Sequence, residues 1–299
     1  MTRRHLALLV LGVIAVSFSS VFVRLAHAPA FAIAFYRCAF ASLVLVPLAW
    51  ARHRDDLRRL GRRETVLLVA SGLVLAAHFA SWIPSISLTT VAASAVLVQT
   101  SPVWVALLGR FVGERAAPGI AAGIALALVG VVAIALAVPS KGGGSRPLLG
   151  DLLALAGAFF AGIYILLGRR LRPVLPLVPY TAVVYAVSSL VLAVAMVASG
   201  TGFTGYPPRV WLLFAAITVG PQFLGHTVFN FLLAHLRASI VSVALLAEPV
   251  GATLLALALL HEAPRWLTVA GGGLVLAGVY LAIRAEARTA REVLDAPLE

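Results

Sequence analysis

The stretch AASAVLVQTSPVWVALLGRFVGERAAPGIAAGIALALVG occupies residues 92–130, and it returns with changes at residues 238–278 as ASIVSVALLAEPVGATLLALALLHEAPRWLTVAGGGLVLAG. Pro102 of the first copy aligns with Pro249 of the second at an offset of 147 residues. Glu114 aligns with Glu262 at an offset of 148, so the features keep their order with only small insertions and deletions. The chain is therefore a duplicated unit of about 147 residues.

The composition places this unit in a membrane. Of the 299 residues, 62% are apolar and only 11% are charged, which is too few to cover a water-soluble core with polar surface. A helix needs about 20 mainly apolar residues to cross the hydrocarbon region. Ten such segments are predicted, five in each copy, at residues 6–26, 30–50, 65–85, 91–111, 118–138, 151–171, 178–198, 210–232, 239–260 and 265–284.

The net charge of +12 is distributed along the chain in a way that orients the protein. When the connections between spans are counted alternately, 17 Lys and Arg residues fall on the side of the N-terminus and 4 on the other side. Basic residues concentrate on the cytoplasmic side of membrane proteins, so both termini are predicted to be cytoplasmic. The basic excess then needs no nucleic acid partner, and the predicted partners are the lipid bilayer and a small-molecule substrate.

Because each copy crosses the membrane five times, the second copy must enter from the opposite side to the first. The predicted fold is an all-α integral membrane protein with ten transmembrane helices in two inverted five-helix repeats. This plan recurs in secondary transporters, which bind their substrates near the bilayer midplane between the repeats. The predicted divisions are a first repeat at 1–138, a linker at 139–150, a second repeat at 151–286 and a cytoplasmic tail at 287–299.

The two aligned prolines lie near the middle of the fourth and ninth spans. Proline removes a backbone donor and leaves a carbonyl that, in a bilayer, must be satisfied by neighbours or by a cavity. We therefore expect Pro102 and Pro249 to break their helices at the midplane and to mark the binding site.

Polar residues recur at helical spacing in two spans. In the eighth span Gln222, His226 and Asn230 follow one another every four residues, and in the third span His78 and Trp82 share a face. His226 lies 148 residues after His78, so the histidines are near-equivalents in the two copies. The alternative is that each histidine is an ordinary, satisfied core residue. The predicted cavity residues are His78, Trp82, Gln99, Ser101, Gln222, His226 and Asn230.

Two charged residues are predicted to lie within the hydrocarbon region. Arg37 falls about a third of the way into the second span, and Glu248 directly precedes Pro249 in the ninth. A buried carboxyl group either pairs with a cation or takes up a proton. The sequence thus allows a buried Arg37–Glu248 ion pair or a proton site at Glu248.

The fifth and tenth spans are rich in glycine. Gly123 aligns with Gly271 at an offset of 148, and further glycines flank both. Small residues let helix backbones approach closely, so these helices are predicted to be packing faces or to form a homodimer. Glu114 and Glu262 precede these spans, where the positive end of a helix dipole favours a carboxylate.

An ordered set of motifs resembles the EamA family of the drug/metabolite transporter superfamily over essentially the whole chain. The resemblance implies ten transmembrane helices in two inverted repeats, residence in the bacterial inner membrane and movement of small metabolites such as amino acids, often outward. One departure is His261, where the family usually has glycine. The motifs are Arg37, Ser101-Pro102, Gly113-Glu114-Arg115, Gly150-Asp151, Glu248-Pro249 and Glu262.

The main rival classes are an intramembrane enzyme and a membrane scaffold that transports nothing. Glu248 is the only carboxylate predicted in the hydrocarbon region, and no Gly-x-Ser-x-Gly motif is present. His78 and His226 lack a third ligand at convincing spacing, and no glycine-rich phosphate loop with its lysine occurs. The sequence predicts neither a metal, nor a cofactor, nor catalytic residues.

Overall fold

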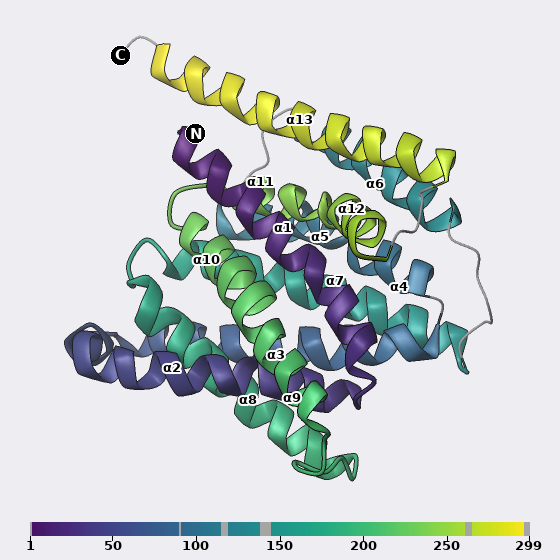
Figure 1. Ribbon diagram of the computed structural model, residues 1–299. Coiled ribbons are helices and arrows are strands. Elements are labelled where there is room, and N and C mark those ends of the chain that lie inside the picture. The colour runs from purple at the N-terminus through teal and green to yellow at the C-terminus, as the bar shows by residue number, and fades with distance from the viewer. Residues whose placement is uncertain (1, 90, 115–118, 138–144, 261–264, 296–299) are drawn as a thin grey trace.

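The computed structural model is a bundle of helices, and the structure describes residues 2–89, 91–114, 119–137, 145–260 and 265–295 (Figure 1). Within these ranges no β-strand occurs, and ten helical segments are long and apolar enough to cross a membrane. Leu136, Leu190 and Leu212 on the outside of the bundle are about 70% exposed, as suits contact with lipid. The predicted all-α membrane fold with ten spans is confirmed.

The helices of the two repeats follow the same order. The first repeat contains α1 (Arg3–Ala26), α2 (Ala30–Arg58), α3 (Arg62–Leu88), α4 (Val91–Val98), α5 (Ser101–Gly109) with the 3-10 turn η1 (Arg110–Val112), and α6 (Ile120–Ala137). The second contains α7 (Pro147–Leu171), α8 (Leu177–Ala198), α9 (Pro208–Ile217), the π-helix η2 (Thr218–Thr227), α10 (Val228–Leu232), α11 (Ala238–Leu245), α12 (Glu248–Leu260) and α13 (Trp266–Asp295).

Two polar segments that we expected outside the helices are largely helical. The basic segment at 51–64 lies between the second and third predicted spans. Most of it continues α2, which ends at Arg58 and contains one non-helical residue, His53. The next helix, α3, begins at Arg62. Likewise α13 continues to Asp295, through most of the expected tail. A helix satisfies its own backbone groups, so it can extend beyond the bilayer when its side chains are polar. Residues 139–144 of the expected linker lie outside the described residues.

Several of the main contacts between helices recur when the two repeats are exchanged. The second span of each repeat packs on the other, α2 against α8, and so does the fifth, α6 against α13 (Figure 1). The third span of each repeat packs against the first span of the other, as α3 against α7 and η2 against α1. A contact pattern with this exchange symmetry is expected from two repeats related by a twofold axis.

The glycines of α6 and α13 show the same symmetry at atomic contact. A Cβ on Gly123 would lie 2.6 Å from the carbonyl oxygen of Gly278, and a Cβ on Gly130 would lie 2.5 Å from that of Gly271. Gly123 aligns with Gly271, and Gly130 aligns with Gly278, so each contact is the copy of the other. Only glycine allows this approach. A homodimer through these glycine faces would have to displace a contact that already exists within the chain.

Candidate functional site

One span in each repeat is broken near its middle, at the predicted prolines. Residues 99–100 separate α4 from α5, and Pro102 lies in the first turn of α5. Residues 246–247 separate α11 from α12, and Pro249 is the second residue of α12. Proline cannot donate to the carbonyl four residues earlier, yet it fits the first turn of a new helix. Each span is therefore two half-helices that meet inside the bundle.

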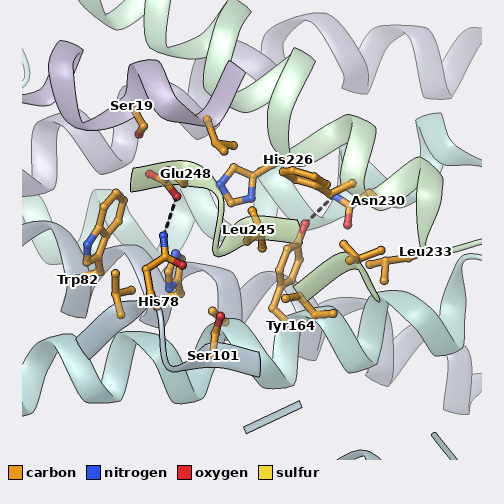
Figure 2. A pocket seen from close by; sticks show the side chains of 17 residues that line it. Ser19, His78, Trp82, Ser101, Tyr164, His226, Asn230, Leu233, Leu245 and Glu248 are labelled. Atoms are coloured by element: carbon orange, nitrogen blue, oxygen red, sulfur yellow. Dashed lines mark hydrogen bonds between the residues drawn. The ribbon is translucent and has the colours of Figure 1, made fainter. Parts of the chain in front are cut away.

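A cavity of about 80 Å³ lies between the two breaks (Figure 2). Residues at the breaks of both spans line it, together with residues of α1, α3, α7, η2 and α10. This volume has room for several water molecules. Its polar lining residues are Ser19, His78, Trp82, Gln99, Ser101, Tyr164, His226, Asn230 and Glu248.

The structure brings six of the seven candidate cavity residues together, and Glu248 joins them. His78, Trp82, Gln99, Ser101, His226 and Asn230 all line the cavity. The seventh, Gln222, does not. Its side chain is fully buried and turned toward α2, because the buried guanidinium of Arg37 there needs an acceptor.

Arg37 is buried beside the cavity, with 1% of its surface exposed. Its Nε donates to Oε1 of Gln222 at 2.8 Å, and its guanidinium carbon lies 4.1 Å from the centre of the Phe79 ring. Its two terminal nitrogens have no hydrogen-bond partner among the described residues. The direct Arg37–Glu248 ion pair that the sequence allows is not formed here, because Gln222 and Phe79 hold the guanidinium.

Glu248 instead joins the two broken spans. Its Oε2 accepts a hydrogen bond from Nε2 of Gln99, in the break of the other repeat, at 3.3 Å. Its backbone oxygen accepts from Oγ of Ser17 on α1 at 3.1 Å. Gly251 permits that approach, because a Cβ at this position would collide with the Ser17 hydroxyl. The carboxyl group is thus placed on the cavity by backbone packing and by one long side-chain hydrogen bond.

The two equivalent histidines both line the cavity but have different neighbours. His78 Nδ1 lies 2.8 Å from the carbonyl oxygen of Gly157, which can only accept. Nδ1 therefore carries the hydrogen, and Nε2 is left as an acceptor. The His78 ring also stacks on Trp82, with 5.8 Å between ring centres. His226 instead meets the edge of Phe79 at 5.5 Å.

Hydrogen bonds from the end of α7 close one end of the cavity. Nε of Arg169 donates to Oε1 of Glu114 at 2.7 Å, and its Nη1 donates to the carbonyl oxygen of Leu233 at 3.0 Å. Nε of Arg172 donates to the carbonyl oxygen of Asn230 at 2.9 Å, although burial lowers the pKa of its guanidinium. Glu114, which we expected to face a helix dipole, is therefore half of an ion pair between α7 and the segment after η1.

The packing of the half-helices agrees with this closure. At the arginine end, α5 packs against α11 and α11 packs against α7. Exchanging the repeats turns these contacts into α4 against α12 and α4 against α1. Neither of these shows comparable packing among the residues that the structure describes. The two ends of the cavity therefore differ. The arginine end is closed by helix packing and hydrogen bonds, whereas the half-helices at the other end are less tightly packed.

Two further polar residues line the cavity: Ser19 on α1, which the sequence analysis did not predict, and Tyr164 on α7, which the sequence offered as a further cavity candidate. The Tyr164 hydroxyl accepts a hydrogen bond from Nδ2 of Asn230 at 2.6 Å. Ser19 is buried, and its hydroxyl has no partner among the described residues. The signal for Ser19 was the serine-rich run SFSS at 17–20, and that for Tyr164 was a lone tyrosine in an apolar span.

The described part of the chain holds no group of three or more His, Cys, Asp and Glu residues placed to bind a metal ion. The cavity histidines are held by a backbone carbonyl and by aromatic rings. What the lining offers is one carboxyl group, neutral polar groups and aromatic and aliphatic surface.

Comparison with known proteins agrees with the duplicated fold. The model of the EamA-like transporter family matches the chain twice, at residues 4–136 and 148–284, with five of the ten spans in each match. An uncharacterized transporter of Archaeoglobus fulgidus is 27% identical over 285 residues, which cover 94% of this chain and 97% of that protein. A protein known from its crystal structure is 19% identical and covers 97% of this chain and 99% of its own, with a TM-score of 0.80. At this identity the last similarity concerns the fold alone.

Proposed function

Because the chain belongs to the EamA-like transporter family, as its ordered motifs indicate, we propose that it is a secondary transporter that exports amino acids or related small metabolites. The observation that carries the proposal is the cavity between the broken spans of two inverted repeats. Transporters of this plan bind their substrates where interrupted helices meet. The protein acts in the cell inner membrane.

Alternating access follows from the difference between the two ends of the cavity. The charge distribution of the connections puts the N-terminus, and with it the arginine end of the cavity, on the cytoplasmic side. The start of α1 and the end of α13 lie on the same side of the bundle, as an even number of membrane crossings requires (Figure 1). The described conformation is then closed to the cytoplasm. Exchange of the two repeats' conformations opens that end and closes the other.

Glu248 is the group that couples transport to protons. It is the only carboxyl group among the described residues that line the cavity, and it forms no ion pair there. The titratable and charged groups that surround it are Arg37 on α2, His78 on α3, Tyr164 on α7 and His226 on η2. Replacing Glu248 by glutamine should remove any pH dependence of transport while the protein still folds. An unchanged pH dependence would remove Glu248 from this role.

The direct test is efflux from liposomes that contain the purified protein. A panel of labelled amino acids, sugars and nucleosides is loaded, and the loss of each is compared with that from protein-free liposomes. Protein-dependent efflux of at least one amino acid or related compound is expected. If neither the panel nor simple aliphatic amines leave faster than from protein-free liposomes, the proposed function is wrong.

An intramembrane enzyme was the main rival class, and the cavity does hold a hydroxyl, two histidines and a carboxyl group. Nucleophilic catalysis needs these groups in hydrogen-bonded succession. Among the described residues, His78 is bonded to a backbone carbonyl and Glu248 to Gln99, and no hydrogen bond joins Ser101 to a histidine. This geometry supports a binding cavity over a catalytic site. A non-transporting scaffold would show no protein-dependent efflux in the experiment above.

A further inference from the structure

We propose that the cavity is built for a protonated amine, which Glu248 receives, and that it therefore prefers amines and amino acid amides to amino acids with a free carboxylate. This inference rests on the proposed transport function and names the substrate class within it. It follows from the charge of the lining, from the unfilled hydrogen-bonding capacity around Glu248 and from the apolar walls.

The charge of the lining has one sign. Among the described residues that line the cavity, Glu248 is the only acid, and no lysine or arginine is present. The nearby cation, Arg37, does not line the cavity and is 1% exposed. Its two terminal nitrogens have no partner among the described residues, but they are buried and are not presented to a solute there. A solute in the cavity therefore meets a carboxylate directly and meets no opposite charge that could neutralise a carboxylate of its own.

Glu248 keeps most of its hydrogen-bonding capacity free. A carboxylate has about four acceptor sites on its two oxygens. Among the described residues, the side chain of Glu248 receives one hydrogen bond, from Gln99, and at 3.3 Å this bond is longer than usual. An ammonium group brings three donors and a positive charge, and charge-assisted hydrogen bonds are the stronger kind. It is the group that best fills these sites.

Other acceptors and aromatic faces lie on the same lining. Nε2 of His78 is an acceptor because Nδ1 donates to a carbonyl. The hydroxyl of Ser19 is buried without a partner among the described residues, and in the view of Figure 2 it lies beside Glu248. The rings of Trp82 and Phe229 also line the cavity, and aromatic faces attract cations. The surroundings of Glu248 are thus suited to a donor-rich cation.

The remaining walls suit a hydrocarbon body. Val16, Val98, Ile165, Val241 and Leu245 line the cavity beside the polar groups. A zwitterionic amino acid could place its ammonium on Glu248, but its carboxylate would then lose water without gaining a cation. Burying an unpaired charge is unfavourable. We therefore expect at least a roughly tenfold preference for the amine over the acid, which corresponds to about 1.4 kcal/mol.

The test uses four compounds that share one aliphatic body: leucine, leucinamide, 3-methylbutylamine and 4-methylpentanoate. Their affinities for the purified full-length protein are measured by calorimetry, and their efflux is measured in liposomes. We expect leucinamide and the amine to bind at least about tenfold more tightly than leucine, and the acid without an amine not to bind. Leucine binding as tightly as leucinamide would overturn the proposal.

Variants assign the preference to Glu248. Glu248→Gln should abolish the preference, and Glu248→Asp, which keeps the charge, should retain it. Glu114→Gln is the matched control, because it removes a carboxylate outside the cavity and should leave the preference intact. A preference that survives in a folded Glu248→Gln variant would overturn the proposal. If Glu248→Gln does not fold, loss of the preference in Glu248→Asp would overturn it instead.

The outcome separates this inference from the transport function itself. Efflux of leucine without a preference for its amide would support the proposed transport function and reject the amine site. Absence of efflux for these compounds and for the whole panel would reject both.

Discussion

The two broken spans share their proline and differ in the residue before it. In the first repeat that residue is Ser101, and in the second it is Glu248, and both side chains line the cavity. The proline sets the backbone break in both copies, at the start of α5 and of α12. The preceding residue sets the chemistry, and only one copy is acidic. Both repeats therefore contain the helix break at proline, but only the second repeat places a carboxyl group beside it.

The same contrast appears at a second pair of equivalent positions. Arg37 corresponds to Val184 at the offset of 147, and Gln222 corresponds to Val74 at the offset of 148. The hydrogen-bonded pair Arg37–Gln222 thus has two valines at its mirror positions. The glycines and prolines are kept in both copies, whereas the buried charged residues Arg37 and Glu248 each occur in one copy. An asymmetric lining inside a symmetric frame can hold a solute in one orientation.

The largest expected effect tests what the copies share. Gly130→Leu and Gly278→Leu each add a side chain where a Cβ would lie 2.5 Å from a backbone oxygen across the α6–α13 contact. Overpacking of a close contact costs about 3 kcal/mol or more, so both variants should lose monodisperse, folded protein in detergent. Gly273→Leu is the control, because nothing lies within 4 Å of a Cβ there. Gly130 and Gly278 are equivalent in the two repeats, so a clear difference between these two variants would contradict the twofold relation.

The next effect tests the residue before each proline. Glu248→Ser should lower efflux of 3-methylbutylamine by at least about tenfold, because the ammonium loses its charged partner. Adding Ser101→Glu returns a carboxylate to the cavity from the opposite repeat and should recover a large part of the efflux. Ser101→Ala alone should change efflux by less than about twofold, the equivalent of less than 0.5 kcal/mol. A folded double variant as inactive as Glu248→Ser would show that the two positions are not equivalent.

A stability effect of intermediate size is expected at the Arg37–Gln222 pair. Gln222→Val removes the only hydrogen-bond acceptor that the described residues provide for the buried guanidinium of Arg37, and it should destabilise the protein by about 3 kcal/mol. Arg37→Met in the same chain removes the stranded charge and should restore most of the thermal stability, measured by unfolding in detergent. If the double variant is less stable than Gln222→Val alone, the guanidinium of Arg37 is stabilised by partners other than Gln222, which would contradict the prediction.

The smallest effect concerns the closed end of the cavity. Arg169→Gln breaks the ion pair between Arg169 and Glu114. Both side chains of this pair are about a quarter exposed. Such pairs contribute about 1 kcal/mol or less, so the ratio of the two conformations should shift by no more than about fivefold. The shift should raise labelling of a cavity cysteine from the cytoplasmic side. Arg170→Gln, at the neighbouring position, is the control.

The sequence was sufficient for the frame and for most of the site. The repeat and the apolar segments predicted ten spans, and helical spacing found His78, His226 and Asn230 because each lies on a polar face. Spacing could not tell that Gln222 turns away, because this depends on a guanidinium brought next to it from α2. The expected Arg37–Glu248 pair assumed that two deep charges must meet. A glutamine acceptor and an aromatic ring hold the arginine instead.

Alternating access through the cavity is tested most directly by two-sided cysteine labelling. Ser101→Cys in a chain with Cys38→Ala places one thiol on the lining, and membrane-impermeant maleimides are applied to right-side-out and inside-out vesicles. We predict labelling mainly from the periplasmic side, increased cytoplasmic labelling when Arg169→Gln is added, and protection by a transported amine on both sides. Labelling from neither side in any of these states, or labelling from one side that no variant or solute alters, would contradict the account.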